Sequence, residues 1–105
     1  MPILKNNPNL KDIQQYVIEL EEERGFTSQD VLTKCLGLGE EVGELFKAIR
    51  KQQKIKIDQN STVGTIEDEL VDIFIYLCSI ANRYDIDLEQ AFRDKEEINK
   101  KRTWE

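Results

Sequence analysis

Apolar side chains recur at intervals of three and four residues along four stretches of the chain. This period is the one that an amphipathic α-helix presents on one face. The stretches cover residues 8 or 9 to 24, residues 28–53, residues 63–84 and residues 87–102. Two apolar stripes are regular enough to predict buried helix faces: Val31, Cys35, Leu38, Val42, Leu45 and Ile49 in the second stretch, and Ile66, Leu70, Ile73, Leu77, Ile80 and Tyr84 in the third. The pattern predicts an all-α domain of four helices with short connections.

Residues that favour helix ends stand close to the ends of these stretches. Asn and Ser side chains cap helix N-termini, Asp favours the first turn, and Gly favours the position after the last turn. The predicted end residues are Asn7 or Asn9 and Gly25 for the first helix, Ser28 with Asp30 in the first turn for the second, and Asp87 for the fourth.

Residues 54–62, with the sequence KIKIDQNST, interrupt the helical period between the second and third stretches. The polar and turn-forming residues predict a loop, which could become ordered over a ligand. The alternation in KIKI leaves a short strand as the alternative.

Length and composition narrow the classes of protein that fit. The chain has 105 residues, of which 39% are hydrophobic and 34% charged, so residues 1–105 are expected to form a single domain with a modest core. Self-association into a homodimer or homotetramer would bury more apolar surface.

A net charge of −6 argues against a nucleic-acid partner. No apolar run reaches membrane-spanning length and the N-terminus lacks a signal-peptide pattern, which predicts a cytoplasmic protein without a membrane partner.

Cysteine and histidine usage adds two expectations. Cys35 and Cys78 lie inside predicted helices, so we expect both to be small buried apolar residues in a reducing compartment. The absence of histidine removes the commonest general base and any zinc site with histidine ligands.

Two acidic pairs interrupt the apolar stripes and are the first candidate for chemistry. Glu41 with Glu44, and Glu69 with Asp72, each have i, i+3 spacing, so each pair shares one helix face. The pairs have similar angular offsets from their apolar stripes, and antiparallel packing would bring the four carboxylates together. Such hard oxygen ligands suit Mg²⁺, with Mn²⁺ possible. The alternative is a solvated acidic face, neutralised by neighbours such as Lys47, Arg50 and Lys51.

Two further residues lie close to these pairs on the predicted helices. Glu40 faces away from the core, so it could ligate a metal only at the wall of an open cleft, or orient a water or ligand. Tyr76 follows Asp72 by one turn and could hydrogen-bond a ligand sugar or phosphate, or pack as an amphipathic edge residue.

The fourth helix carries a basic extension of its apolar stripe. Lys95, Asn99 and Arg102 continue the direction set by Leu88 and Phe92. Polar side chains that face inward need a partner, and a phosphate would provide one for Lys and Arg. The alternative is that the helix projects beyond the core at this end.

Together these residues resemble a known family. The pattern EEVGE at residues 40–44, followed after a loop by ELVD at residues 69–72, is similar to the EExxE…ExxD signature of the MazG-type nucleotide pyrophosphohydrolases, which belong to the all-α NTP pyrophosphatase superfamily. The segments DELVDIFIYL, IDLEQAF and KEEINKKRTW also look family-like, so the resemblance covers roughly residues 10–104.

The resemblance implies Mg²⁺-dependent hydrolysis of a nucleoside triphosphate to the monophosphate and pyrophosphate, in nucleotide-pool house-cleaning. It also implies a dimer or a dimer of dimers with sites near the subunit interface. By analogy with the family, Glu41, Glu44, Glu69 and Asp72 hold metal, and Glu40 is a further ligand or orients the attacking water. Tyr76, Lys95, Asn99 and Arg102 are the candidate substrate contacts.

Two departures from the family pattern affect substrate choice. Several relatives place a tryptophan near the end of the first helix, where it can stack on a base, whereas this chain has Phe26 in the matching region and its single tryptophan at Trp104. Residues 54–62 carry no recognisable specificity motif. A dUTPase-like or phosphoribosyl-ATP-type pyrophosphohydrolase therefore stays open as an alternative, as does a non-catalytic helical interaction module.

Overall fold

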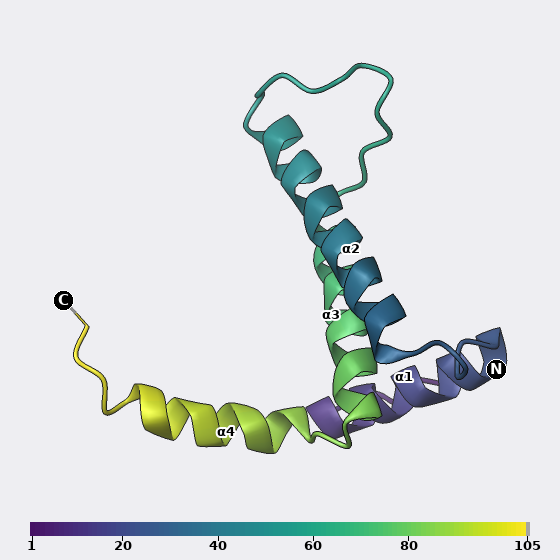
Figure 1. Cartoon of the computed structure of the whole chain (residues 1–105), viewed down its shortest axis with the longest axis vertical. Coiled ribbons are helices and arrows are strands. Elements are labelled where there is room, and N and C mark those ends of the chain that lie inside the picture. Colours follow the sequence, from purple (N-terminus) through teal and green to yellow (C-terminus); the bar gives the residue numbers. More distant parts are fainter. Residues whose placement is uncertain (105) are drawn as a thin grey trace.

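The computed structural model describes residues 1–104 and contains four helices: α1 (Leu10–Arg24), α2 (Val31–Gln52), α3 (Ile66–Arg83) and α4 (Leu88–Asn99). Figure 1 shows α2 and α3 side by side as an antiparallel hairpin, with α1 and α4 at its foot. The prediction of an all-α fold with four helices is confirmed. None of these helices combines the length and the apolar character that crossing a membrane requires.

Local sequence signals explain most helix ends. Asn9 caps α1 through a reciprocal capping box with Asp12, and Gly25 ends it with a φ of 75°, a left-handed conformation that glycine adopts without strain. Thr65 caps α3 and Asp87 caps α4. The second helix was predicted to begin at Ser28, which is wrong. Asp30 is its N-cap because the Asp30 carboxylate accepts a hydrogen bond from the Thr33 amide at 2.8 Å.

The structure corrects the predicted end of the fourth helix and decides between the two predictions for the segment that connects the second and third helices. The fourth helix ends at Asn99, so Arg102 lies beyond it and not on the helical stripe. The connection between α2 and α3 contains turns and irregular backbone, which confirms the loop at residues 54–62 and excludes a strand at KIKI.

The buried core lies where α1 crosses α3. Val17, Leu20 and Cys78 are its buried residues, and Ile13, Tyr16, Ile75 and Leu88 pack against them. Burial raises the pKa of the Cys78 thiol to about 11. Cys35 was also expected to be buried, but it is exposed. The reason is that the most buried positions of α2 are Lys34 and Ala48, so the helix face near Cys35 points away from the rest of the chain.

One apolar face of the molecule remains uncovered. Leu70, Leu77, Ile49 and Tyr84 belong to the predicted buried stripes, yet each is between 40% and 60% exposed. Figure 1 shows why: α4 extends away from the hairpin and covers neither of its helices along their length. The radius of gyration is 16.5 Å, whereas a compact chain of this length has about 13 Å. A single copy is therefore an open arrangement and not a closed four-helix bundle.

A buried ion pair joins α1 to the C-terminal end of α3. The Arg83 guanidinium donates to both carboxylate oxygens of Glu21, at 2.7 and 3.2 Å, and the Ser79 hydroxyl donates to the same carboxylate at 2.6 Å. Arg83 also donates to the carbonyls of Phe26 and Gln29 in the α1–α2 connection. Although burial alone would raise the pKa of Glu21, the hydrogen bonds from Arg83 and Ser79 lower it below its usual value.

We expect Arg83→Met to destabilise the fold by about 3 kcal/mol, because it leaves the Glu21 carboxylate buried without its partner. The pH dependence should also change. In the parent chain the lowered pKa of Glu21 adds stability above about pH 4.5, and this contribution is lost as pH falls through the lowered value. In Arg83→Met the Ser79 hydrogen bond remains, but burial, the largest single influence on Glu21, is no longer offset by Arg83. The pKa of Glu21 should then rise, and stability should instead fall as pH rises through it.

Urea unfolding followed by circular dichroism between pH 3 and pH 7 measures both effects. Arg93→Met is the matched control, because Arg93 pairs with Glu89 on the exposed surface of α4, where an ion pair contributes little. Equal stability of the parent and Arg83→Met at pH 7 would contradict the prediction.

Candidate metal centre

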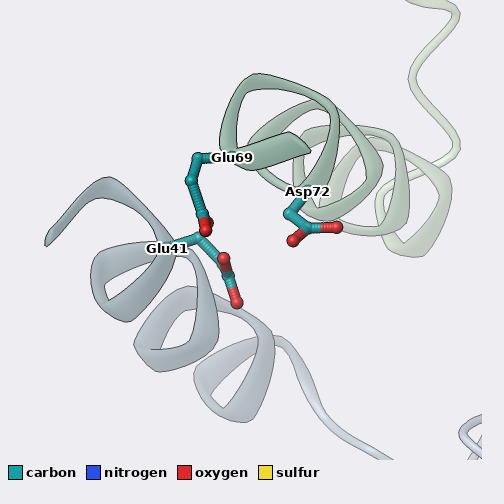
Figure 2. A group of neighbouring side chains, drawn as sticks. All are labelled: Glu41, Glu69 and Asp72. Carbon is teal, nitrogen blue, oxygen red and sulfur yellow. The ribbon is translucent and has the colours of Figure 1, made fainter. Parts of the chain in front are cut away.

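Three carboxylates converge where the middle of α2 faces the N-terminal half of α3. Glu41 comes from α2, and Glu69 and Asp72 come from α3. Each offers an oxygen that lies within 4.8 Å of the oxygens offered by the other two. Figure 2 shows the Glu69 side chain extending from α3 towards Glu41 on α2, with the Asp72 carboxylate on the same side of α3.

The burial of the three carboxylates differs in a way that leaves the cluster open on one side. Glu69 is 8% exposed and lies at the buried side of the cluster, Glu41 is half-buried, and Asp72 is exposed. Gly64 lies directly against the Glu69 carboxylate, and a Cβ atom there would collide with Oε1. The end of the α2–α3 connection therefore closes over the cluster on the Glu69 side, while the Asp72 side faces solvent.

The electrostatics of the cluster favour a bound cation. Burial raises the pKa of Glu41, and the nearby carboxylates of Glu69, Asp72 and Glu44 raise it further. Among residues 1–104 no Lys or Arg nitrogen lies within 4.0 Å of these three carboxylates. The donors are all carboxylate oxygens, the ligand type that Mg²⁺ and Mn²⁺ prefer, so the residues present fit such an ion.

The other two acidic candidates lie outside this group. The Glu44 carboxylate contacts Lys47 Nζ at 3.5 Å instead of joining the three, and Glu40 is exposed on the neighbouring face of α2. A ligand or water-orienting role for either residue stays a prediction.

A pocket of about 250 Å³ opens beside the cluster, towards the C-terminal end of α1. Glu41 and Asp72 lie at one end of it, and Tyr76 is part of its wall. The Tyr76 ring rests against Gly37 of α2, where an added Cβ would lie 2.5 Å from ring carbon Cε1. Glycine at this position therefore lets the ring sit between the two helices.

The basic candidates of α4 are not at this pocket within one chain. Lys95 and Asn99 line a different hollow, together with Phe74 and Leu77 of α3. The Asn99 Oδ1 atom is buried and has no hydrogen-bond partner among the described residues. Arg102 is exposed beyond the helix, 5.6 Å from the Trp104 ring. The structure therefore brings Tyr76 close to the acidic cluster but does not bring these three residues to it.

The sequence contains a polar pattern that predicts part of the wall of the pocket beside the acidic cluster, in addition to the apolar pattern. Polar residues follow each other along α3 at alternating spacings of three and four, which places them on one face: Glu69, Asp72, Tyr76, Ser79 and Arg83. On α2, Lys34 precedes Glu41 by seven residues and shares its face. Polar periodicity, read together with apolar periodicity, would have added Lys34 and Ser79 to the candidates for this pocket, and Arg83 as the partner of Glu21.

Comparison with known proteins assigns the family. Residues 29–103 match the model of the MazG nucleotide pyrophosphohydrolase domain, which includes α2, α3 and α4. The chain belongs to the MazG nucleotide pyrophosphohydrolase family. The predicted resemblance is thereby confirmed, and as a family member the chain is a nucleotide pyrophosphohydrolase.

Solved structures of MazG-type proteins share the fold. A crystal structure of iMazG from Vibrio DAT 722 is 29% identical, with a TM-score of 0.69 over 89% of this chain and 99% of that chain. A crystal structure of YPJD from Bacillus subtilis, a protein assigned as a pyrophosphatase, is 25% identical, with a TM-score of 0.78 over 94% of this chain and all of that chain. No curated protein matches the sequence.

Proposed function

We propose that this MazG-family chain hydrolyses a nucleoside or deoxynucleoside triphosphate to the monophosphate and pyrophosphate, with Mg²⁺ as the metal. The observation that carries the proposal is the convergence of Glu41, Glu69 and Asp72 beside a pocket that Glu41 and Asp72 also line. A divalent ion, when bound, neutralises phosphate charge and makes a water more acidic.

In this proposal the chain's own carboxylates have separate roles. Glu69 and Asp72 hold the metal on the α3 side, and Glu41 and Glu44 hold it on the α2 side. Glu40 orients the attacking water, and Glu41 or Glu40 accepts its proton as the water oxygen bonds to phosphorus and the α–β phosphoanhydride bond breaks. No histidine is required, which suits a chain that has none.

We further propose that the protein works as a homodimer or homotetramer. Lys95, Asn99 and Arg102 lie away from the acidic cluster within one copy, and in this proposal they contact its substrate from a second copy. The uncovered apolar face of α3 and the extended position of α4 support this arrangement. We place the activity of this single-domain protein in the cytoplasm, where free Cys35 and Cys78 stay reduced.

The experiment that tests the function is the release of pyrophosphate from a panel of NTPs, dNTPs and damaged nucleotides. We expect pyrophosphate, not orthophosphate, to be released with Mg²⁺, and the rate to fall by roughly 100-fold or more with EDTA. Excess Mg²⁺ added after EDTA should restore the rate, which separates metal removal from inactivation.

The same panel separates the alternatives. A strong preference for dUTP, or for phosphoribosyl-ATP added to the panel, would identify one of the related pyrophosphohydrolase activities. No pyrophosphate from any substrate, with folded protein and Mg²⁺ present, would contradict the proposal and favour the non-catalytic interaction module.

A further inference from the structure

Lys34 is a buried cation in the wall of the pocket beside the acidic cluster. The residue is 6% exposed, although it carries a charge and lies in the first turns of α2. Its Nζ atom lies 5.0 Å from the centre of the Phe26 ring and 5.5 Å from the centre of the Tyr76 ring. The two aromatic faces stabilise the ammonium group and fix its position in the pocket wall.

Among residues 1–104, no oxygen accepts a hydrogen bond from the Lys34 ammonium group. The nearby Glu21 carboxylate is already occupied by Arg83 and Ser79, and no carboxylate oxygen of residues 1–104 lies within 4.0 Å of Lys34 Nζ. Burial lowers the pKa of Lys34 and the positive charge of Arg83 lowers it further, while Glu21 opposes both effects. Aromatic rings do not replace oxygen acceptors, so this donor in the pocket wall is free to bind an acceptor that a ligand brings.

The shape of the pocket indicates which part of a nucleotide would reach Lys34. The acidic end, with Glu41 and Asp72, suits the metal-bound phosphates. Away from these carboxylates the lining includes Leu20, Phe26 and Ile75, whose apolar surfaces can pack against a flat ring. The polar residues in this part of the lining are Glu21, Arg24, Lys34 and Ser79. A nucleotide whose phosphates lie at the carboxylates therefore directs its base towards Phe26 and Lys34.

We propose that Lys34 donates a hydrogen bond to an exocyclic carbonyl oxygen of the nucleobase, and thereby selects oxo bases over adenine. This inference rests on the proposed function for the placement of the phosphates. Hypoxanthine presents an acceptor oxygen at the ring position where adenine presents an amino group. An ammonium group donates to the first and meets only another donor at the second, so Lys34 is a specificity residue for the base.

The test compares inosine and adenosine nucleotides, which differ at this position of the base. We expect the parent enzyme to prefer ITP over ATP in kcat/KM by roughly 10- to 100-fold, the usual discrimination of a well-placed hydrogen bond. Lys34→Met keeps an unbranched side chain between the two rings but removes the donors. It should reduce the ITP/ATP ratio to within a few-fold of one, mainly through loss of ITP turnover. Lys34→Arg should retain part of the preference.

Lys51→Met is the matched control, because Lys51 is an exposed lysine of the same helix. It should leave the ratio unchanged. An unchanged ratio in Lys34→Met would overturn the proposal. An equal loss of both substrates in that variant would also overturn it, since that result indicates a phosphate contact. Thermal unfolding of each variant shows that the fold is retained.

Binding without catalysis separates this inference from the proposed function. Calorimetry with IMP and AMP, in EDTA, measures base recognition when no reaction takes place. If the parent protein binds IMP more tightly than AMP and Lys34→Met loses that difference, the inference holds even where no pyrophosphate is released. If pyrophosphate is released but the parent protein does not distinguish IMP from AMP, the inference fails while the proposed function stands.

Discussion

Replacing Asp72 by asparagine is expected to lower kcat by roughly 10³-fold, the largest effect on activity of any single change considered. The substitution keeps the size of the side chain but removes one of three negative charges whose oxygens lie within 4.8 Å of each other. Because Asp72 is exposed, the fold should remain intact and the loss should fall on metal binding and turnover. Steady-state pyrophosphate release and calorimetric titration with Mg²⁺ measure the two losses.

Glu67→Gln is the matched control for this prediction. Glu67 is also an exposed carboxylate in the first half of α3, but it lies outside the group of three. It should retain turnover within about two-fold, as expected for a surface change away from the site. Unchanged turnover in both Asp72→Asn and Glu41→Gln would show that the acidic cluster is not the catalytic centre.

Leu77→Glu is expected to convert the protein from an oligomer to a monomer, with the dissociation constant raised by roughly 10³-fold. Leu77 is 44% exposed on the uncovered apolar face of α3 and lines a hollow with Phe74 and Phe92. In a two-fold symmetric interface each substitution occurs twice, so two carboxylates are buried or brought together at once. Sedimentation equilibrium over a range of protein concentrations measures the change.

The matched control is Ile55→Glu, which introduces the same charge at an isoleucine that is 56% exposed in the α2–α3 connection. This variant should keep the oligomeric state of the parent. Turnover of Leu77→Glu should fall as well, because the proposed contacts from Lys95, Asn99 and Arg102 come from another copy. A parent protein that is monomeric at all concentrations would refute the assembly, and full turnover in that monomer would refute the shared site.

Much of the fold was predictable because helix formation here follows local signals. Apolar periodicity located the four helices, and side-chain chemistry correctly predicted the cap at Asp87 and gave Asn9 as one of two candidates for the first helix. Ser28 was a wrong choice because two plausible caps lie within three residues, and only the geometry shows that Asp30 accepts the Thr33 amide. Such local competition is not resolved by residue preferences alone.

The burial of the apolar stripes on α2 and α3 was harder to predict, because it depends on whether α4 packs against them. A stripe that includes Leu70 and Leu77 indicates a face that avoids water, but it does not say whether the covering surface comes from the same chain or from another. Cys35 was misplaced for a related reason: one helical position separates it from Lys34, which takes the buried position. Periodicity fixes an angle only to within about one residue.

The convergence of Glu41, Glu69 and Asp72 followed from spacing and antiparallel packing. Lys34 could not be found in this way, because a lysine beside an apolar stripe usually extends its charge into water. Its burial requires two aromatic rings from different segments, Phe26 in a connection and Tyr76 on α3. Contacts of that kind depend on tertiary structure and are invisible to a pattern along one helix.

The antiparallel pairing of α2 with α3 has a consequence for how the chain folds. The two helices are consecutive in sequence and joined by a connection of thirteen residues, Gln53–Thr65, so their contacts close a short loop at a small entropic cost. Contacts of this local kind form early, on the submillisecond to millisecond timescale of helical proteins. The fourth helix lacks a partner surface along most of its length in one copy, so in the proposed oligomer it would gain its packing when chains meet. Maturation of the enzyme should then be limited by encounters between chains, and so by protein concentration, after each hairpin has formed.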